Sequence, residues 1–155
     1  PNRMLLALRM QQAIEMGVLT STRIAVLYLD LNGFKAINDR LGHDAGDAAL
    51  RAVTQRLTLA IRSTDVLARV GGDEFVILLS ALDTHGELAA EMVAKKCLAV
   101  FEQPFVIQGE LCRLGASIGL SMCAAEDTPE TLLTAADKAM YQAKMLGDGH
   151  VFWAQ

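Results

Sequence analysis

The chain has 155 residues, of which 52% are apolar, and a formal net charge of −4. A chain of this length can bury one hydrophobic core without disulfides or metals. The acidic balance argues against a nucleic-acid duplex as partner, because binding many phosphates needs a basic face. No apolar run reaches the roughly 18 residues of a membrane span, and the first residues show no signal-peptide pattern.

We therefore expect one cytoplasmic domain over residues 1–155 that makes no membrane contact itself. Its start, which runs directly into a helical segment, suggests a domain excised from a longer protein. A membrane anchor elsewhere in that protein would be compatible with this expectation. The cysteines are odd in number and scattered, which favours reduced apolar thiols over a disulfide framework or a zinc site; they are Cys97, Cys112 and Cys123.

The first predicted elements are a helix and a buried strand. Apolar residues at helical spacing predict a helix over residues 5–16, with Gly17 as its expected end. Residues 23–31 are rich in β-branched and aromatic side chains and almost continuously apolar, as a strand buried on both faces would be. Asp30, near the end of this strand, is therefore conspicuous.

Turn chemistry at Asn32-Gly33 follows the strand, and residues 34–61 predict two helices broken around Gly42 to Gly46. Two strands come next, over residues 65–70 and 75–80. The Gly-Gly pair that opens their connection is a strong hairpin signal, since glycine accepts the positive φ that tight hairpin turns demand.

The second half predicts helices that alternate with short strands. A helix is expected over residues 86–102, which Pro104 prevents from continuing. A second hairpin is expected in residues 104–122, around Gln108-Gly109-Glu110. Thr128-Pro129 supplies a cap and a first-turn proline for a helix that runs to Gly147, and a last short strand is possible over residues 150–153. This order favours an α+β fold with one sheet and helices packed on it.

Carboxylates mark one edge of this predicted sheet. Asp30 leaves the end of a buried strand, and Asp73 and Glu74 sit on the turn of a hairpin that could lie beside it. Like charges held close together repel unless a divalent cation neutralises them, and hard oxygen ligands favour Mg²⁺ or Mn²⁺. Two metals held in this way suit the in-line attack of a hydroxyl on a phosphate. The simpler alternative is that these acidic residues lie in turns without binding a metal.

Several motifs, in order along the chain, resemble those of the GGDEF family. The resemblance covers nearly the whole chain, starting at Pro1-Asn2-Arg3, which is similar to the tail of the family's opening motif. The motifs are residues 30–39 (DLNGFKAIND), Gly42-His43, Gly46-Asp47, Gly71-Gly72-Asp73-Glu74-Phe75, Ser117-Ile118-Gly119 and residues 136–144 (ADKAMYQAK).

This resemblance implies a palm-like, mostly antiparallel central sheet flanked by helices, related to nucleotide cyclases. It also implies a diguanylate cyclase, which condenses two GTP molecules into cyclic di-GMP and two pyrophosphates with two Mg²⁺ or Mn²⁺ ions per active site. Each protomer would bind one GTP, so a homodimer is required. Sensory or phosphodiesterase domains would be neighbours in the longer protein.

The resemblance also implies roles for the acidic residues. Asp30 and Asp73 would be metal ligands through their side chains, and Leu31 through its carbonyl. Asp73 is also the expected base for the attacking 3′-hydroxyl, and Glu74 a further ligand. Lys35 would offset charge that develops in the transition state.

The remaining expected contacts are to the nucleotide. Gly71 and Gly72 would let the backbone approach it closely, and Lys144 would face phosphates. Asn38 and Asp47 would read guanine, since a carboxylate accepts from an N1–H and 2-amino edge that adenine lacks.

His43 would line the guanine pocket, although a histidine at a helix terminus can simply pair with a carbonyl. For Lys35 and Lys144 the alternative is a solvated helix face. Phe34, Met140 and Tyr141 are expected to be core residues of amphipathic helices, despite lying inside motifs.

An inhibitory product site is expected upstream of the signature. Arg62 and Asp65 resemble the family's RxxD motif, in which arginine grips a phosphate or guanine edge of cyclic di-GMP while the aspartate accepts from guanine. The alternative is a surface ion pair of little energetic weight.

The sequence departs from the family pattern after Lys144, where Gly-Arg-Asn is common. Here the residues are Gly147-Asp148-Gly149, so a carboxylate replaces an arginine expected to meet phosphate. Two rival functions stay open: a GTP-binding regulatory domain that controls an adjacent phosphodiesterase domain, and a cyclic di-GMP receptor that acts through Arg62 and Asp65.

Overall fold

A computed structural model describes residues 3–147 and 149–154 of the chain. The described residues form five helices and seven strands. The helices are α1 (Arg3–Thr20), α2 (Phe34–Leu41), α3 (His43–Ala60), α4 (Gly86–Ala99) and α5 (Pro129–Met145). The strands are β1 (Arg23–Asn32), β2 (Val66–Arg69), β3 (Glu74–Leu82), β4 (Phe105–Ile107), β5 (Glu110–Cys112), β6 (Gly115–Met122) and β7 (Val151–Trp153).

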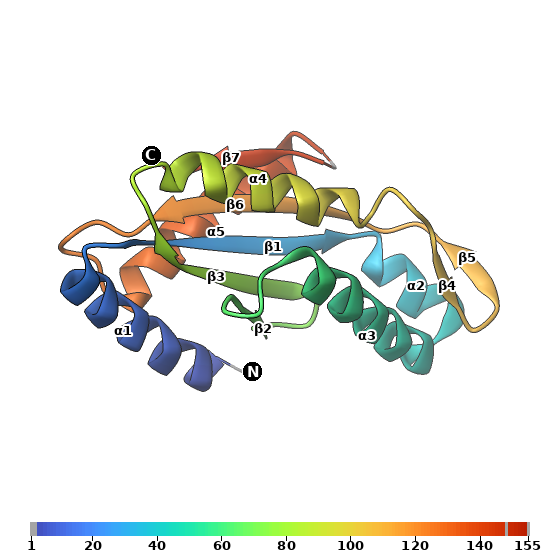
Figure 1. Cartoon of the computed structure of the whole chain (residues 1–155). Helices are drawn as coiled ribbons and strands as arrows, with labels where there is room; N and C mark the ends of the chain where they lie inside the picture. Colours follow the sequence, from blue (N-terminus) through green and yellow to red (C-terminus); the bar gives the residue numbers. More distant parts are fainter. Residues whose placement is uncertain (1–2, 148, 155) are drawn as a thin grey trace.

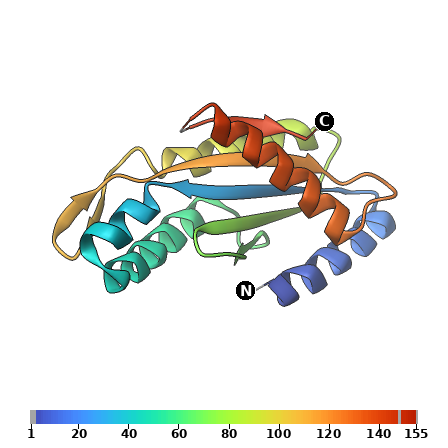
Figure 2. The ribbon, with the colours of Figure 1, turned by 180° about the vertical axis from the view of Figure 1, so that it is seen from behind.

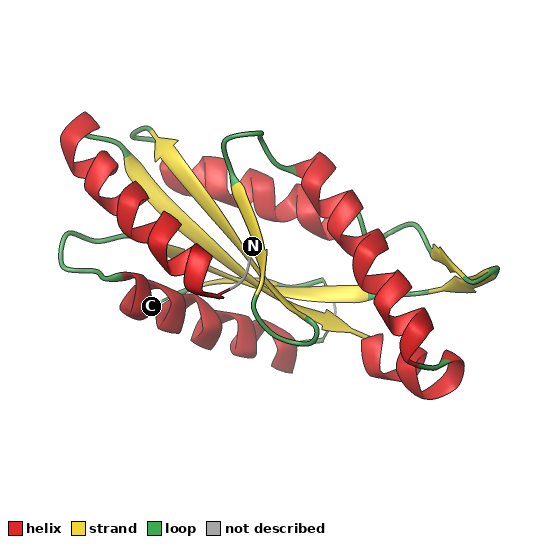
Figure 3. Cartoon of the chain, turned by 90° about the horizontal axis from the view of Figure 1, so that it is seen from below, coloured by secondary structure: helices red, strands yellow, loops and turns green. Residues whose placement is uncertain are grey.

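Five of the strands form one sheet in the order β2-β3-β1-β6-β7 (Figure 1). All neighbours in it are antiparallel except β6 and β7, which run parallel. Helices cover both faces of this sheet (Figure 3). The predicted α+β class with a mostly antiparallel central sheet is therefore confirmed.

Strand β1 lies at the centre of the sheet and is buried on both faces, which explains its nearly continuous apolar sequence. Alternate side chains point to opposite faces. Leu27, Leu29 and Leu31 join the core beneath α3 and α4. Val26 and Tyr28 join the core formed with α1 and α5, whose ribbons cross the other face (Figure 2). Asp30, two residues after Tyr28, belongs to this second face.

Two helix boundaries differ from the sequence prediction. Helix α1 continues through Gly17 to Thr20. Gly17 does not end the helix; it allows the backbone of Thr22 to lie close to the helix. The Gly17 carbonyl accepts a hydrogen bond from Thr22 N–H at 3.0 Å, and a methyl group at position 17 would lie 3.0 Å from the Thr22 carbonyl oxygen. The break after α2 occurs at Gly42 alone, with φ of 93°, while Gly46 lies inside α3.

The middle of the chain also differs in detail. Helix α4 ends at Ala99, three residues earlier than expected. The hairpin turn at Gln108-Gly109 is confirmed, and both residues have positive φ. However, β4 and β5 form a separate two-stranded ribbon beside α2, and β6 leaves it to join the central sheet (Figure 1).

The predicted start of α5 is confirmed. Thr128 Oγ1 accepts from Thr131 N–H at 3.2 Å, and Pro129 occupies the first turn. The three cysteines are unpaired thiols. In the part of the chain that the structure describes, no helix combines the length and apolar character needed to cross a membrane.

Gly119 sets how closely α5 packs against the sheet. A methyl group at this position on β6 would lie 2.1 Å from the carbonyl oxygen of Ala136 and 2.2 Å from the backbone nitrogen of Met140. Both atoms belong to the backbone of α5, so no rotamer change could relieve the clash. Since Gly119 also lies opposite Tyr28 on β1, this contact fixes α5 above the polar end of the strand.

We predict that Gly119→Ala lowers the free energy of unfolding by about 3 kcal/mol, because α5 must move away from the sheet. Gly72→Ala is the matched control, since a methyl group there meets nothing within 4 Å, and it should change stability by less than about 0.5 kcal/mol. Urea unfolding measures both. Similar midpoints for the two variants would contradict the packing role of Gly119.

Candidate active site

The pairing of β1 with β3 brings the predicted carboxylates together. Asp30 lies directly opposite Glu74 in the antiparallel register. The next residue, Leu31, donates its N–H to the carbonyl of Asp73 at 3.0 Å. Asp30 is buried, whereas Asp73 and Glu74 are half-buried. The sequence prediction that the hairpin turn lies beside the end of β1 is therefore confirmed.

The proximity of these groups affects their protonation. Burial raises the pKa of Asp73, and the negative charge of Asp30 raises it further. Burial also raises the pKa of Glu74, although a hydrogen bond from Tyr28 opposes this shift. Both carboxyl groups therefore lie where an additional positive charge would be favourable.

One such charge already comes from α5. The Lys144 ammonium forms an ion pair with the Asp30 carboxylate. This hydrogen bond is the main reason that the pKa of Lys144 is raised. Lys144, predicted to face phosphates, is thus bound to a predicted metal ligand in this structure.

The site is suited to a cation whose remaining ligands are waters and substrate phosphates. No group of three His, Cys, Asp or Glu side chains within residues 3–147 and 149–154 is arranged to hold a metal ion. However, Asp30 and Asp73 lie close enough to repel each other, and Asp30 already attracts an ammonium group. Mg²⁺ is typically bound by one or two carboxylates together with waters and substrate phosphates. The donor set is compatible with that mode of binding.

The connection between β2 and β3 keeps the signature residues in place, but not through the expected backbone geometry. Neither Gly71 nor Gly72 has positive φ, because the connection spans four residues rather than a two-residue turn. Arg69 Nε donates to the carbonyls of Gly71 and Gly72 at 3.0 and 3.2 Å. Glu74 Oε1 would lie 2.8 Å from a methyl group at Gly71, so glycine there makes room for this carboxylate.

The predicted guanine-reading residues meet where α2 joins α3. Asn38 is half-buried on α2, and Asp47 is exposed on the first turns of α3. The side-chain amide of Asn38 lies over Gly46, the residue before Asp47. His43 is exposed at the first position of α3, and Lys35 is exposed in the first turn of α2.

Arg62 and Asp65 contact each other at the opposite end of β2 from the signature. Arg62 Nη2 donates to Asp65 Oδ1 at 2.7 Å, and the backbone N–H of Arg62 donates to Oδ2 at 2.9 Å. Arg62 also donates to the carbonyl of Ser80 at 2.9 Å. The Asp65 carboxylate is buried by these contacts. This is the geometry of the ion-pair alternative, and a ligand would have to exchange with it.

Sequence reasoning missed Tyr28 and Arg69. Tyr28 donates its hydroxyl to Glu74 Oε1 at 3.2 Å, and burial together with nearby negative charge raises its pKa to about 12. The available signal was its position two residues before Asp30, which places both on one face of the strand. No comparable signal marked Arg69.

Further outcomes concern motif residues on α2 and α5 and the residue that departs from the family pattern after α5. Met140 is buried as expected, and so is Phe34, but Tyr141 is 64% exposed. Tyr141 lies one position after the buried stripe of the helix, so the prediction of a core residue was wrong. Asp148 lies outside the described residues.

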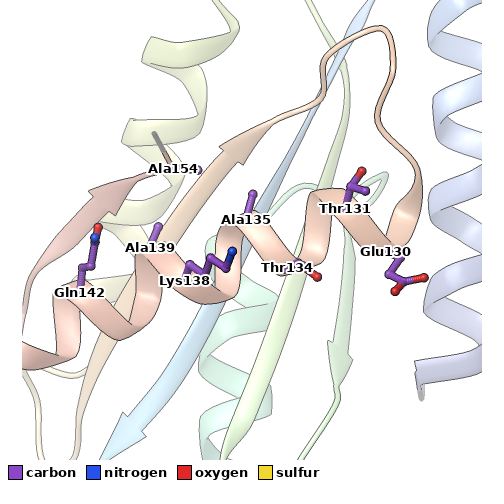
Figure 4. A pocket seen from close by; sticks show the side chains of 8 residues that line it. All are labelled: Glu130, Thr131, Thr134, Ala135, Lys138, Ala139, Gln142 and Ala154. Atoms are coloured by element: carbon purple, nitrogen blue, oxygen red, sulfur yellow. The ribbon is translucent and has the colours of Figure 1, made fainter.

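A different hollow, of about 380 Å³, lies along the outer side of α5 next to Ala154 (Figure 4). It contains none of the predicted site residues. Its lining consists of Glu130, Thr131, Thr134, Ala135, Lys138, Ala139, Gln142 and Ala154. The candidate active site lies instead where the β2–β3 connection meets the end of β1 and the end of α5.

A known protein family matches nearly the whole chain. The profile of the family described as "Diguanylate cyclase, GGDEF domain" matches residues 1–150. The chain belongs to the GGDEF family. The predicted resemblance to this family is thus confirmed.

Relatives of this GGDEF domain include multidomain proteins. The chain is 41% identical over 155 residues to MucR of Pseudomonas aeruginosa, which is named a bifunctional diguanylate cyclase/cyclic di-GMP phosphodiesterase. The alignment covers 99% of this chain but only 22% of MucR. A structure comprising only the GGDEF domain of TpbB (YfiN) from P. aeruginosa superposes with a TM-score of 0.94 at 36% identity, covering 100% of this chain and 90% of that one. The structure of an EAL/GGDEF domain protein from M. capsulatus superposes with a TM-score of 0.82 at 39% identity, covering 100% of this chain and 99% of that one.

The ion pair between Lys144 and Asp30 leads to a prediction about cation binding. Lys144→Met should lower the free energy of unfolding by about 1–2 kcal/mol, because it leaves a buried carboxylate without its partner. Added Mg²⁺ should then raise the melting temperature of the variant more than that of the parent, since the cation replaces the lost ammonium charge. Thermal unfolding with and without Mg²⁺, at constant ionic strength, measures this. An equal Mg²⁺ effect on both proteins would count against a cation site at Asp30.

Proposed function

We propose that residues 1–155 form a single, catalytically active diguanylate cyclase domain that condenses two GTP molecules into cyclic di-GMP and two pyrophosphates. The observation that carries this proposal is the β1–β3 register, which aligns Asp30 with Glu74 beside Asp73 and the signature glycines. The sequence similarity to proteins named diguanylate cyclases supports it. We place the domain in the cytoplasm, within a longer protein that carries sensory or phosphodiesterase domains.

Two Mg²⁺ or Mn²⁺ ions per active site would be held by Asp30, the Leu31 carbonyl, Asp73 and Glu74. Bound there, the ions would neutralise phosphate charge and polarise the reacting phosphate. Asp73 accepts the proton of the 3′-hydroxyl that attacks the α-phosphorus of the second GTP, while the bond to pyrophosphate breaks. Lys35 offsets the negative charge that grows on the phosphate.

Residues at the junction of α2 with α3 and at the end of α5 bind the nucleotide. Asp47 accepts from the N1–H and 2-amino groups of guanine, with Asn38 and His43 lining the same pocket. Gly71 and Gly72 let the backbone approach the nucleotide. Lys144 exchanges its contact with Asp30 for a phosphate when the nucleotide binds.

Catalysis requires two copies of the domain. Each protomer holds one GTP. Each of the two phosphodiester bonds of the cyclic product forms when the 3′-hydroxyl of one GTP attacks the α-phosphorus of the GTP on the other protomer. We place the two carboxylate sites opposite each other across this dimer. A homodimer is therefore part of the proposal.

A catalytically weak regulatory domain is the second candidate, because MucR combines cyclase and phosphodiesterase functions in one chain. Such a domain would bind GTP and control its neighbour. It would have no need of a positioned base, whereas this chain retains both Asp73 and Glu74. We therefore favour the enzyme.

We predict that Asp73→Ala lowers cyclic di-GMP formation at least about a hundredfold, because it removes both a metal ligand and the base. The melting temperature should stay close to that of the parent. Glu126→Ala, which removes an exposed carboxylate from the β6–α5 connection, is the control and should retain activity. The assay measures product from GTP and Mg²⁺, with the domain alone and fused to a dimerising coiled coil.

Two results would contradict the proposal. Turnover of Asp73→Ala within tenfold of the parent would remove the assigned role of this residue. GTP binding without any product, even from the fused dimer, would favour the regulatory alternative.

We also propose that Arg62 and Asp65 bind product and inhibit the enzyme. The Arg62 side chain is 49% exposed, and its contact with Asp65 positions the guanidinium at the surface. Arg62→Ala should abolish cyclic di-GMP binding measured by calorimetry and leave the initial rate unchanged, since the pair lies away from the carboxylate edge. Unchanged product affinity would make Arg62 and Asp65 an ordinary surface ion pair.

A further inference from the structure

Gly46 occupies a position in α3 where its backbone does not require glycine. It lies inside the helix and donates its N–H to the Gly42 carbonyl at 3.1 Å. Its φ is not positive, unlike that of Gly42 at the helix start. Glycine is among the least favourable residues for a helix interior, and alanine is the most favourable. Something other than backbone conformation must therefore account for a glycine here.

The neighbour that needs the space is Asn38 on α2. A methyl group at position 46 would lie 1.8 Å from Asn38 Oδ1, 2.8 Å from Cγ and 3.4 Å from Nδ2. These three atoms belong to one side-chain amide, which therefore lies directly over the helix backbone. The backbone carbonyl of Asn38 also accepts the Gly42 N–H at 2.9 Å, which fixes α2 relative to the start of α3.

The contact at Gly46 differs from the contact at Gly119. At Gly119 the nearest atoms belong to the backbone of α5, which cannot move without disrupting the core. At Gly46 the nearest atoms are the end of a half-buried side chain that can rotate away. An added methyl group at position 46 should therefore leave the fold intact and displace only the amide.

We infer that Gly46 is a positioning residue for guanine recognition: its missing side chain lets the Asn38 amide lie against the first turns of α3, next to Asp47. The inference rests on the proposed function, in which Asn38 and Asp47 read the base. It adds that the selectivity for guanine depends on a residue that does not itself contact the nucleotide. It also explains why the helix tolerates glycine at this position.

Four proteins test the inference: the parent, Gly46→Ala, Asn38→Ala and the double variant. Calorimetry with Mg²⁺ measures the affinity for 3′-deoxy-GTP, which cannot react, and for 3′-deoxy-ATP as the control. Each single variant should bind the guanine nucleotide about tenfold more weakly, as expected for the loss of one hydrogen bond. The double variant should bind no more weakly than Asn38→Ala, and affinity for the adenine nucleotide should not change.

Thermal unfolding separates positioning from structural support. Gly46→Ala should raise the melting temperature by about 2–4 °C, because alanine favours the helix. A lower melting temperature with equal losses for both nucleotides would overturn the inference in favour of a structural role. Parent-like affinity of Gly46→Ala, with weakened Asn38→Ala, would overturn it while leaving the proposed role of Asn38 intact. Parent-like affinity of Asn38→Ala would instead refute that role.

Discussion

The antiparallel pairing of β1 with β3 is the constraint on which the site depends. It places Asp30 opposite Glu74 and joins Leu31 to Asp73 through a backbone hydrogen bond. A slip of one residue would turn every side chain of β1 to the other face of the sheet and bury Asp30 among leucines. Because β1 is buried on both faces, the pairing that brings these charges together lies within the hydrophobic core.

Concentrating carboxylates at the end of a buried strand is unfavourable unless other groups offset the charge. Lys144 provides the balancing charge for Asp30, and the Tyr28 hydroxyl hydrogen bonds to Glu74. Both partners occupy the α1/α5 face, and close packing at Gly119 keeps α5 within reach of Asp30. A nucleotide with its cations would replace Lys144 at this position, so the domain without ligand already contains a substitute for the charge it is proposed to bind.

The sequence was sufficient to predict the sheet, most helices and the meeting of Asp30 with Asp73 and Glu74, because these follow from apolar periodicity and turn residues. It was insufficient where a glycine serves a neighbouring side chain or helix. Gly17 and Gly46 resembled helix breaks but permit close contacts made by residues from other segments. The signature glycines adopt no positive φ, since a four-residue connection with Arg69 bonds replaces the tight turn. Such reasons depend on tertiary neighbours, which local patterns do not contain.

The central claim is that the carboxylate edge binds a divalent cation together with the nucleotide. The most direct measurement is the affinity for 3′-deoxy-GTP with Mg²⁺ and with EDTA, at equal ionic strength, in the parent and in Asp30→Asn. The account predicts that Mg²⁺ tightens binding to the parent at least about tenfold, the effect of roughly 1.4 kcal/mol of added electrostatic interaction, and that Asp30→Asn loses most of this gain. An affinity that does not depend on Mg²⁺, or an equal Mg²⁺ effect in both proteins, would contradict it.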